Sequence, residues 1–536
     1  MTLIEHDPEA FPGLEPGTGA ATDGHGPDAS TGAVLRARRR WFRRAAAGRP
    51  APPAHRLGVD LDSPVPPSRG DGMPAGGRIA NPMGGDQWQG TTAQLCGLFP
   101  FAAPSGAHLR GVPVGINAHT GEPVGLDPAQ LLVDGLVSNT GLWIQGQPGI
   151  GKSTFVKRLL LGLAGFGFNV QILGDLKDEY EDIIRALDGQ IIHLGRGRGT
   201  LNPLDTAPLR GAINASVGAR RQQLIDDAAE SRLALLEALL AIESRTDNLR
   251  ASERVLLARA VEIASRVAEA ENRDPIIPEV LAVIDAGGAE CMQAVAATSG
   301  ADYEQKVLEL VSSLRLMCEG AIKGIFDRPS SFRIDDDTRA VSVSLASVED
   351  ASDNVVAAAM MCSWAWSSAM TAGQVAAGKR RNVFQVQDEL WRALRAAPGL
   401  VEKSDRVTRL GRHRGVISAQ VTHSLEDLEA LPSESDRAKA RGLAARNALK
   451  VIGGTDNREM DRLDEITPFT SYERAEVTSW SAPPTWVPGQ QHPGRGRYLI
   501  KSGERIGIPV RMTLTDRERV LYNTDKAFSS LKRGGQ

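Results

Sequence analysis

The segment from Gly146 to Thr154 has the residue types and spacing of a phosphate-binding loop. In order, its residues are Gly146, Gln147, Pro148, Gly149, Ile150, Gly151, Lys152, Ser153 and Thr154. Glycines let consecutive backbone N–H groups wrap a β-phosphate, Lys152 can reach the β- and γ-phosphates, and the Ser153 hydroxyl can bind Mg²⁺. This pattern predicts that the segment binds a nucleoside triphosphate together with Mg²⁺.

The residues that flank this loop have the composition that such a loop needs. Leu142–Gln145 is a short apolar strand candidate, and residues 155–168 have the composition of a buried helix. A helix that opens at Lys152 would point the positive end of its dipole at the phosphates. A glycine-rich turn with a chance lysine would not require the order of strand, loop and helix that is found here.

A second acidic element follows a later strand candidate. Residues 383–387 lead directly into Asp388 and Glu389. Adjacent carboxylates at the end of a strand predict that Asp388 binds Mg²⁺, directly or through water, and that Glu389 orients or deprotonates the attacking water. The alternative is a charged turn before the helix that starts near Leu390.

A third strand candidate covers residues 415–420 and ends in an amide. Gln420 is therefore the candidate sensor of the γ-phosphate or of the attacking water. A solvated strand end with no catalytic role is the alternative.

Composition limits the class of protein. The chain has 536 residues, of which 41% are hydrophobic, enough for one large core or two modest cores. A net charge of −3 makes no case for nucleic-acid binding by the whole protein. The cysteines are far apart and lack metal-ligand or redox spacing, so they are expected to be small core residues in a reducing cytoplasm. They are Cys96, Cys291, Cys318 and Cys362.

Neither a signal peptide nor a membrane span is expected. The first thirty residues lack an apolar core and contain several acidic residues. The longest uncharged stretch, residues 354–378, is interrupted by Ser, Thr, Gly and Gln, which favours a buried helix over a transmembrane segment. A cytoplasmic location follows as an expectation.

The pattern along the chain predicts five regions. These are a disordered Pro/Gly-rich arm at 1–90, a small β lead-in at 91–140, a first part of an ATPase core at 141–212, an all-helical insertion at 213–328, and a second core part with C-terminal strands at 329–530. Within the arm, residues 34–47 carry six arginines around Trp41 and Phe42. They form either a basic helix that docks on an acidic partner, DNA or an anionic membrane, or a solvated basic patch.

The strands and helices of the two core parts alternate. Strand candidates at 169–174, 190–194 and 341–345 accompany those already described. Alternation of this kind predicts an α/β fold with a mostly parallel sheet covered by helices on both faces.

The order of these motifs resembles one family. Leu201-Asn202-Pro203-Leu204-Asp205 lies between the acidic turn after the second strand and the helical region, and Asp388-Glu389-Leu390-Trp391 and Gln420 follow. This order is similar to that of the conjugative type IV secretion ATPases of the TraC type, in the HerA/FtsK superfamily of P-loop ATPases. The segments 99–101, 115–117 and 324–327 also resemble that group, so the resemblance covers about residues 95–530.

The resemblance implies a RecA-like P-loop ATPase fold and an ATP-hydrolysing site. Its residues would be Lys152, Ser153, Asp388, Glu389 and Gln420. The family's active form implies a homo-hexameric ring in which each subunit supplies an arginine to its neighbour's γ-phosphate. Residues 411–415 resemble the basic turn that carries this arginine, with Arg412 the first candidate and Arg414 the second. Either could instead be a solvent-facing charge at a helix end.

Two functions follow from the resemblance. One is a cytoplasmic ATPase that powers conjugative DNA transfer or type IV secretion, held at the inner face of the membrane by channel components embedded in it. The other is a DNA translocase of the coupling-protein type that acts directly on DNA. The basic residues of the C-terminal strands are spread out and are expected to lie on a solvated sheet face, which favours the first function. They are Arg495, Arg497, Lys501, Arg505 and Arg511. A scaffold that binds ATP without turning it over is disfavoured by the adjacent Asp388 and Glu389.

Overall fold

The computed structural model describes most of the chain beyond residue 109. The described residues are 71–73, 77–79, 110–244, 249–334, 338–378, 381–397, 399–402, 415–431, 433–483 and 492–523. The chain divides into two compact units, residues 1–96 and 97–536. In the first unit, β1 (Asp71–Met73) and β2 (Gly77–Ile79) form an antiparallel hairpin within the segment expected to be disordered. The basic segment 34–47 and the segment 99–101 lie outside the described residues.

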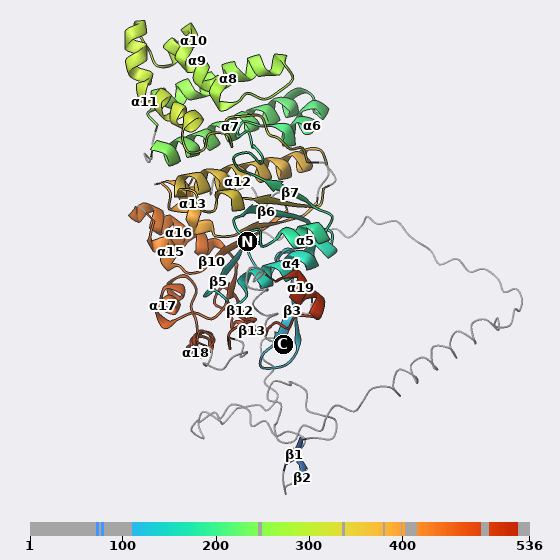
Figure 1. Ribbon diagram of the computed structural model, residues 1–536. Coiled ribbons are helices and arrows are strands. Elements are labelled where there is room, and N and C mark those ends of the chain that lie inside the picture. Colours follow the sequence, from blue (N-terminus) through green and yellow to red (C-terminus); the bar gives the residue numbers. More distant parts are fainter. Residues whose placement is uncertain are drawn as a thin grey trace, which may run out of the picture. The chain divides into compact units, whose positions relative to one another are not determined.

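The second unit is built on an eleven-stranded sheet with the order β4-β3-β13-β12-β11-β5-β10-β9-β6-β8-β7 (Figure 1). Every pair from β11 to β7 in this order is parallel. These strands are β11 (Leu449–Ile452), β5 (Leu142–Gln145), β10 (Val416–Thr422), β9 (Val383–Gln387), β6 (Asn169–Asp175), β8 (Ala340–Ser344) and β7 (Gln190–His193). The predicted α/β class and mostly parallel sheet are therefore confirmed.

The remaining strands extend the sheet in antiparallel register beyond β11. They are β12 (Arg497–Ser502), β13 (Ile508–Arg511), β3 (Val112–Asn117) and β4 (Pro123–Leu126). The lead-in strand β3 thus pairs with β13 of the C-terminal hairpin and β4 pairs with β3, although the sequence suggested only that both strands feed into β5. Lys501 of β12 is buried and ion-paired with Glu473 at 3.0 Å, so the expectation of a solvated face is wrong for this residue.

Alternate residues of the central strands point to opposite faces of the sheet. Leu142 and Ile144 pack in one core with α4 (Lys152–Gly165) and α5 (Glu181–Ala186). Trp143, which lies between them, packs in the other core with α12 (Asp353–Ala376). Both faces are therefore covered, as expected for strands that are buried on two sides.

Helix α12 is the apolar stretch that raised the question of a membrane span. By length and composition it is the one helix of the described ranges apolar enough to cross a bilayer, but 78% of its apolar window is buried inside the protein. It packs between the sheet and the helices α6 (Ala207–Ala215) and α7 (Gly218–Ser244), as Figure 1 shows. A Cβ at Gly373 would lie 1.9 Å from the carbonyl oxygen of Pro208, so the close approach of α12 to α6 requires glycine there.

Helices α6 and α7 begin the segment of the chain between β7 and β8. The helices that follow them in this segment are α8 (Ala251–Ala270), α9 (Ile277–Ala286), α10 (Ala289–Ala294) and α11 (Gly300–Glu319). Among the residues described from 207 to 319, every regular element is a helix.

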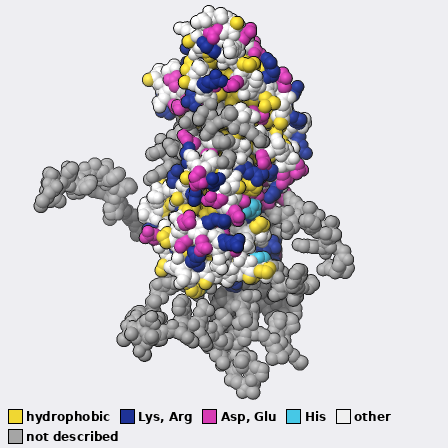
Figure 2. All heavy atoms as spheres, turned by 90° about the vertical axis from the view of Figure 1, so that its left-hand side faces the viewer, with side chains coloured by type: hydrophobic (Ala, Val, Ile, Leu, Met, Phe, Trp, Pro, Cys, Tyr) yellow, Lys and Arg dark blue, Asp and Glu magenta, His cyan; other side chains and the backbone are white. Residues whose placement is uncertain are grey.

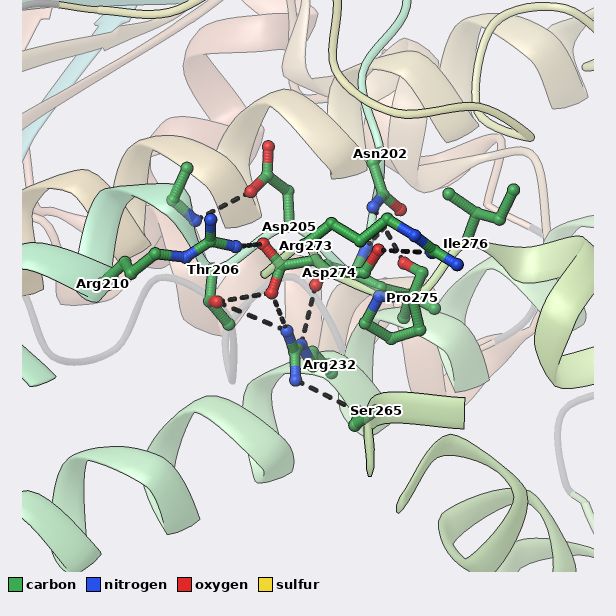
Figure 3. A network of polar contacts seen from close by, with 12 residues as sticks. Asn202, Asp205, Thr206, Arg210, Arg232, Ser265, Arg273, Asp274, Pro275 and Ile276 are labelled. Atoms are coloured by element: carbon green, nitrogen blue, oxygen red, sulfur yellow. Dashed lines mark hydrogen bonds and ion pairs between the residues drawn. The ribbon is translucent and has the colours of Figure 1, made fainter. Parts of the chain in front are cut away.

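The segment Asn202–Thr206 is anchored to these helices by a network of polar contacts (Figure 3). Asp274, before α9, accepts hydrogen bonds from Thr206, from Arg210 of α6 and from Arg232 of α7. Arg232 also donates to the carbonyl oxygen of Leu204 at 2.7 Å, and Asn202 donates to the carbonyl oxygen of Pro275 at 2.9 Å. The Asn-Pro-Leu-Asp motif thus links β7 to the helical region rather than contributing to the phosphate-loop cavity.

The other helices of the second unit cover the sheet near its antiparallel end and beside β10. They are α3 (Pro128–Val133), α13 (Leu390–Leu394), α15 (Glu426–Glu429), α16 (Glu434–Arg446), α17 (Asn457–Ile466), α18 (Ser471–Ser479) and α19 (Asp516–Leu521), with the 3-10 helix η1 (Ala346–Val348) after β8. Helix α19 is tied to α4 by an ion pair between Arg158 and Glu518 at 2.6 Å.

Candidate functional site

The phosphate loop connects the end of β5 to the start of α4. Gly149 and Gly151 have φ values of 83° and 98°, in the left-handed region where side chains with a Cβ are disfavoured. Gly151 is the N-cap of α4, and Lys152 is its first residue. The N-terminus of α4 therefore points its free N–H groups toward the loop, as a phosphate-binding helix requires.

The backbone of the loop is held by contacts from distant parts of the chain. The N–H of Gln147 donates to the carbonyl oxygen of Gly454 at 3.0 Å, and the N–H of Gly496 donates to that of Ile150 at 3.0 Å. The Tyr498 hydroxyl donates to the carbonyl oxygen of Gly151 at 2.6 Å. These bonds engage one N–H and two carbonyl groups of the loop and hold its conformation.

A cavity of about 300 Å³ lies over this loop. It is lined by Pro148, Gly149, Gly151, Lys152, Ser153, Thr154, Gly174, Asp175, Leu176, Lys177, Glu179, Asp388, Glu389, His423 and Arg495. The structure thus brings together the loop and the predicted acidic pair, which are more than two hundred residues apart in the chain. The other loop residues, Gly146, Gln147 and Ile150, support the cavity without lining it.

Lys152 is 8% exposed and is held by three acceptors. Its Nζ lies 2.7 Å from the carbonyl oxygen of Gly146, 3.3 Å from that of Gln147, and 2.8 Å from His423 Nδ1. Burial lowers the pKa of Lys152 to about 8, against the opposing charges of Asp388 and Glu389. The ammonium group of Lys152 can therefore exchange these three acceptors for the phosphate oxygens of a nucleotide.

Asp388 follows the last residue of β9. Its Oδ2 accepts a hydrogen bond from the Tyr180 hydroxyl at 2.8 Å, and its Oδ1 accepts one from the backbone N–H of Glu389 at 3.0 Å. Burial, together with the negative charge of Glu389, raises the pKa of Asp388 to about 6. A nearby cation would stabilise the ionised form of this carboxyl group.

Glu389 has three side-chain partners. Its Oε1 lies 3.1 Å from Lys177 Nζ and 3.1 Å from His423 Nε2, and its Oε2 accepts from Trp391 Nε1 at 2.8 Å. Burial alone would raise the pKa of Glu389, but the His423 contact, Lys177 and Trp391 hold that pKa well below its usual range. Its backbone φ of 51° is unusual for a residue other than glycine, and such backbone strain is often found at functional sites.

His423 connects the lysine of the loop to Glu389. It directly follows β10, and its two ring nitrogens contact Lys152 and Glu389. The ammonium group of Lys152 can only donate, so Nδ1 accepts and Nε2 carries the hydrogen that is donated to Glu389.

Gln420 does not lie where the sequence predicted. Strand β10 continues to Thr422, so Gln420 is inside the strand and not at its end. It is 7% exposed, donates to Gln387 at 3.1 Å and accepts from Asn447 at 2.9 Å, and it does not line the cavity. The predicted strand end is wrong by two residues, and the side chain that reaches the cavity from β10 is His423. Arg412 and Arg414 lie outside the described residues.

The end of β6 and the turn after it supply residues that sequence reasoning did not assign to the site. Asp175 accepts hydrogen bonds from the backbone N–H groups of Lys177, Glu179 and Tyr180, and burial raises its pKa to about 7. The Oε2 atom of Glu179 is buried and has no hydrogen-bond partner. The feature of the sequence that could have identified this turn as part of the site is its run of acidic residues directly after a strand.

The cavity fits Mg²⁺ that arrives with a nucleotide. Within the described residues, no group of three or more His, Cys, Asp or Glu side chains is placed to hold a metal ion by itself. Magnesium in triphosphate sites uses one or two protein oxygens, and phosphates and water complete its shell. Ser153 and Asp388 line the same cavity, and the buried Glu179 Oε2 lacks a donor.

No protein-family model and no curated protein sequence matches the chain. Among solved structures, it is similar to VirB4 of Thermoanaerobacter pseudethanolicus, at 18% identity and a TM-score of 0.57, over 77% of this chain and 100% of that one. It also matches plasmid coupling protein TrwB in complex with ADP and Mg²⁺, at 13% identity and a TM-score of 0.47, over 76% and 91% of the two chains. The likeness to VirB4 confirms the RecA-like P-loop fold, and this chain shares that fold with VirB4.

Proposed function

We propose that this protein is an ATPase that hydrolyses ATP to power conjugative DNA transfer or type IV secretion. The observation that carries the proposal is the single cavity in which Lys152 and Ser153 of the loop meet Asp388 and Glu389. This arrangement suits the binding and hydrolysis of a nucleoside triphosphate. The resemblance of the ordered motifs to secretion ATPases and the shared fold with VirB4 support the cellular role.

In the proposed reaction, the backbone N–H groups of residues 146–154 and Lys152 bind the phosphates of ATP. Ser153 and Asp388 would hold Mg²⁺, which neutralises charge on the β- and γ-phosphates when bound. Glu389 positions the attacking water and accepts its proton. His423 contacts both Lys152 and Glu389, so we assign it the sensing role that the sequence gave to Gln420.

The active form in this proposal is a homo-hexameric ring that docks on channel components embedded in the membrane. Arg412, or Arg414 as the second candidate, would reach the γ-phosphate of the neighbouring subunit. The expected location is cytoplasmic, at the inner face of the membrane.

The test is phosphate release from ATP by the full chain, with two variants. Glu389→Gln should retain ATP binding and slow turnover by about 10² or more, because the amide cannot accept the proton. Lys152→Ala should weaken ATP binding itself. Turnover that is unchanged in both variants would contradict the proposal.

The ATPase rate measured with and without DNA distinguishes a secretion ATPase from a DNA translocase. A rate that is indifferent to DNA supports the secretion ATPase. Strong stimulation by DNA that fades as salt rises would favour the translocase, because phosphate contacts release counterions. Figure 2 shows basic and acidic side chains interspersed on one face of the molecule, which agrees with the first outcome.

A further inference from the structure

The C-terminal hairpin contributes a cation to the phosphate-loop cavity. Arg495 lines the cavity together with Lys152 and Ser153, although it lies 343 residues after Lys152 in the sequence numbering. It lies two residues before β12 and next to Gly496, whose N–H donates to the carbonyl oxygen of Ile150. The backbone at Arg495 is thus fixed to the phosphate loop itself.

A second contact makes this placement rigid. The Tyr498 hydroxyl donates to the carbonyl oxygen of Gly151, and its ring packs on that of Phe155, with ring centroids 4.9 Å apart. Tyr498 is 1% exposed. Arg495 therefore belongs to a segment that contacts both the phosphate loop, through Gly496 and Tyr498, and the first turn of α4, through Tyr498.

The other cations that line the cavity already have partners, whereas Arg495 is available to bind a ligand. Lys177 is ion-paired with Glu389 at 3.1 Å, and Lys152 is held by carbonyl oxygens and His423. In the described part of the chain, Arg495 forms no ion pair with a carboxylate, and it is exposed at the cavity. A triphosphate carries several negative charges, and a guanidinium group binds phosphate oxygens with two parallel hydrogen bonds.

We propose that Arg495 binds the phosphates of the nucleotide in the same subunit, as a second cation beside Lys152. This inference rests on the proposed ATP site and adds a residue from the C-terminal hairpin to it. The contact would also link the nucleotide to the segment that leads into β12, which pairs with β13.

Equilibrium titration of the full chain with Mg-ATP tests the proposal. Arg495→Ala should weaken binding about tenfold, as expected for loss of a charge-assisted hydrogen bond. Arg495→Lys should recover part of the affinity. Arg497→Ala is the matched control, because Arg497 lies two residues on in β12, outside the cavity lining, and its loss should leave affinity unchanged.

Inorganic tripolyphosphate with Mg²⁺ is the second probe, because it has no base. Arg495→Ala should weaken its binding by a similar factor. An unchanged tripolyphosphate affinity beside a weakened ATP affinity would overturn the proposal, since the guanidinium group would then contact the base.

The outcomes separate this proposal from the proposed function. Unchanged ATP binding in Arg495→Ala with a loss in Lys152→Ala overturns the role of Arg495 alone. Unchanged binding in both variants overturns the ATP site itself. Thermal unfolding without nucleotide, compared among the variants, shows whether each one is folded.

Discussion

One imidazole ring touches both the P-loop lysine and the candidate catalytic carboxylate. We predict that His423→Ala lowers kcat roughly tenfold while the Kd for ATP changes little, because Glu389 loses a partner that orients it.

Gln420→Met should instead lower the free energy of unfolding by about 1–3 kcal/mol, because Gln387 and Asn447 lose a buried partner. Steady-state kinetics, ATP titration and chemical unfolding give these quantities.

A conservative variant distinguishes positioning from simple packing at His423. The side-chain amide of His423→Gln can accept from Lys152 and donate to Glu389, so this variant should recover part of the kcat that is lost in His423→Ala. A drop in kcat for Gln420→Met, with no drop for His423→Ala, would return the sensing role to Gln420.

Asp388 predicts how Mg²⁺ dependence changes with pH. Its raised pKa of about 6 means that below pH 6 most of the carboxyl groups are neutral and must lose a proton before they bind a cation. The Mg²⁺ concentration for half-maximal ATPase activity should therefore rise about tenfold per pH unit below 6 and stay level above 7. In Asp388→Asn this rise should vanish, and a rise that persists there would assign the titration to another group.

The link between the helices and the core depends on a small set of buried charges. The Asp274 side chain, in the connection between α8 and α9, is 10% exposed and binds Arg232 of α7, which is 13% exposed. We predict that Asp274→Ala destabilises the packing of α8 to α11 by about 3 kcal/mol, because Arg232 remains buried without its partner. Amide hydrogen exchange of these helices would show the loss as faster exchange.

The matched control is another aspartate–arginine pair in the helical region, between α9 and α11. Asp285 and Arg315 form an exposed pair at 3.2 Å, with side chains 42% and 53% exposed. Asp285→Ala should cost less than about 1 kcal/mol, since exposed pairs are weak. Equal effects of the two substitutions would mean that the buried network does not determine how the helices are anchored.

Assembly of subunits predicts a dependence on concentration. If the neighbour supplies an arginine, ATPase activity per subunit should rise with protein concentration as rings form, and sedimentation velocity should show larger species over the same range. Mixing Lys152→Ala with Arg412→Ala should restore part of the activity lost by each, because one variant keeps the arginine and the other keeps the cavity. Constant activity per subunit from monomers would contradict the ring.

Local patterns predicted which residues line the cavity better than they predicted the contacts that hold it. The phosphate loop, Asp388 and Glu389 were identifiable because glycine spacing and adjacent acids at a strand end are local signals. His423 was missed because β10 continues two residues beyond Gln420, and strand ends depend on pairing with β5 that no single segment reveals. The contacts of Gly496 and Tyr498 with the loop join residues far apart in the chain and have no local sequence signal.

The place of β5 in the sheet has a consequence for how the protein is made. This strand carries the phosphate loop, yet its two neighbours are β10 and β11, which end at residues 422 and 452. During synthesis, β5 leaves the ribosome long before either neighbour exists, so both of its edges are unpaired until most of the chain has been translated. Unpaired apolar strands are prone to aggregation. A nascent chain that stops before β10 therefore has an incomplete nucleotide site and an apolar strand with two unpaired edges, which makes such a chain prone to aggregation.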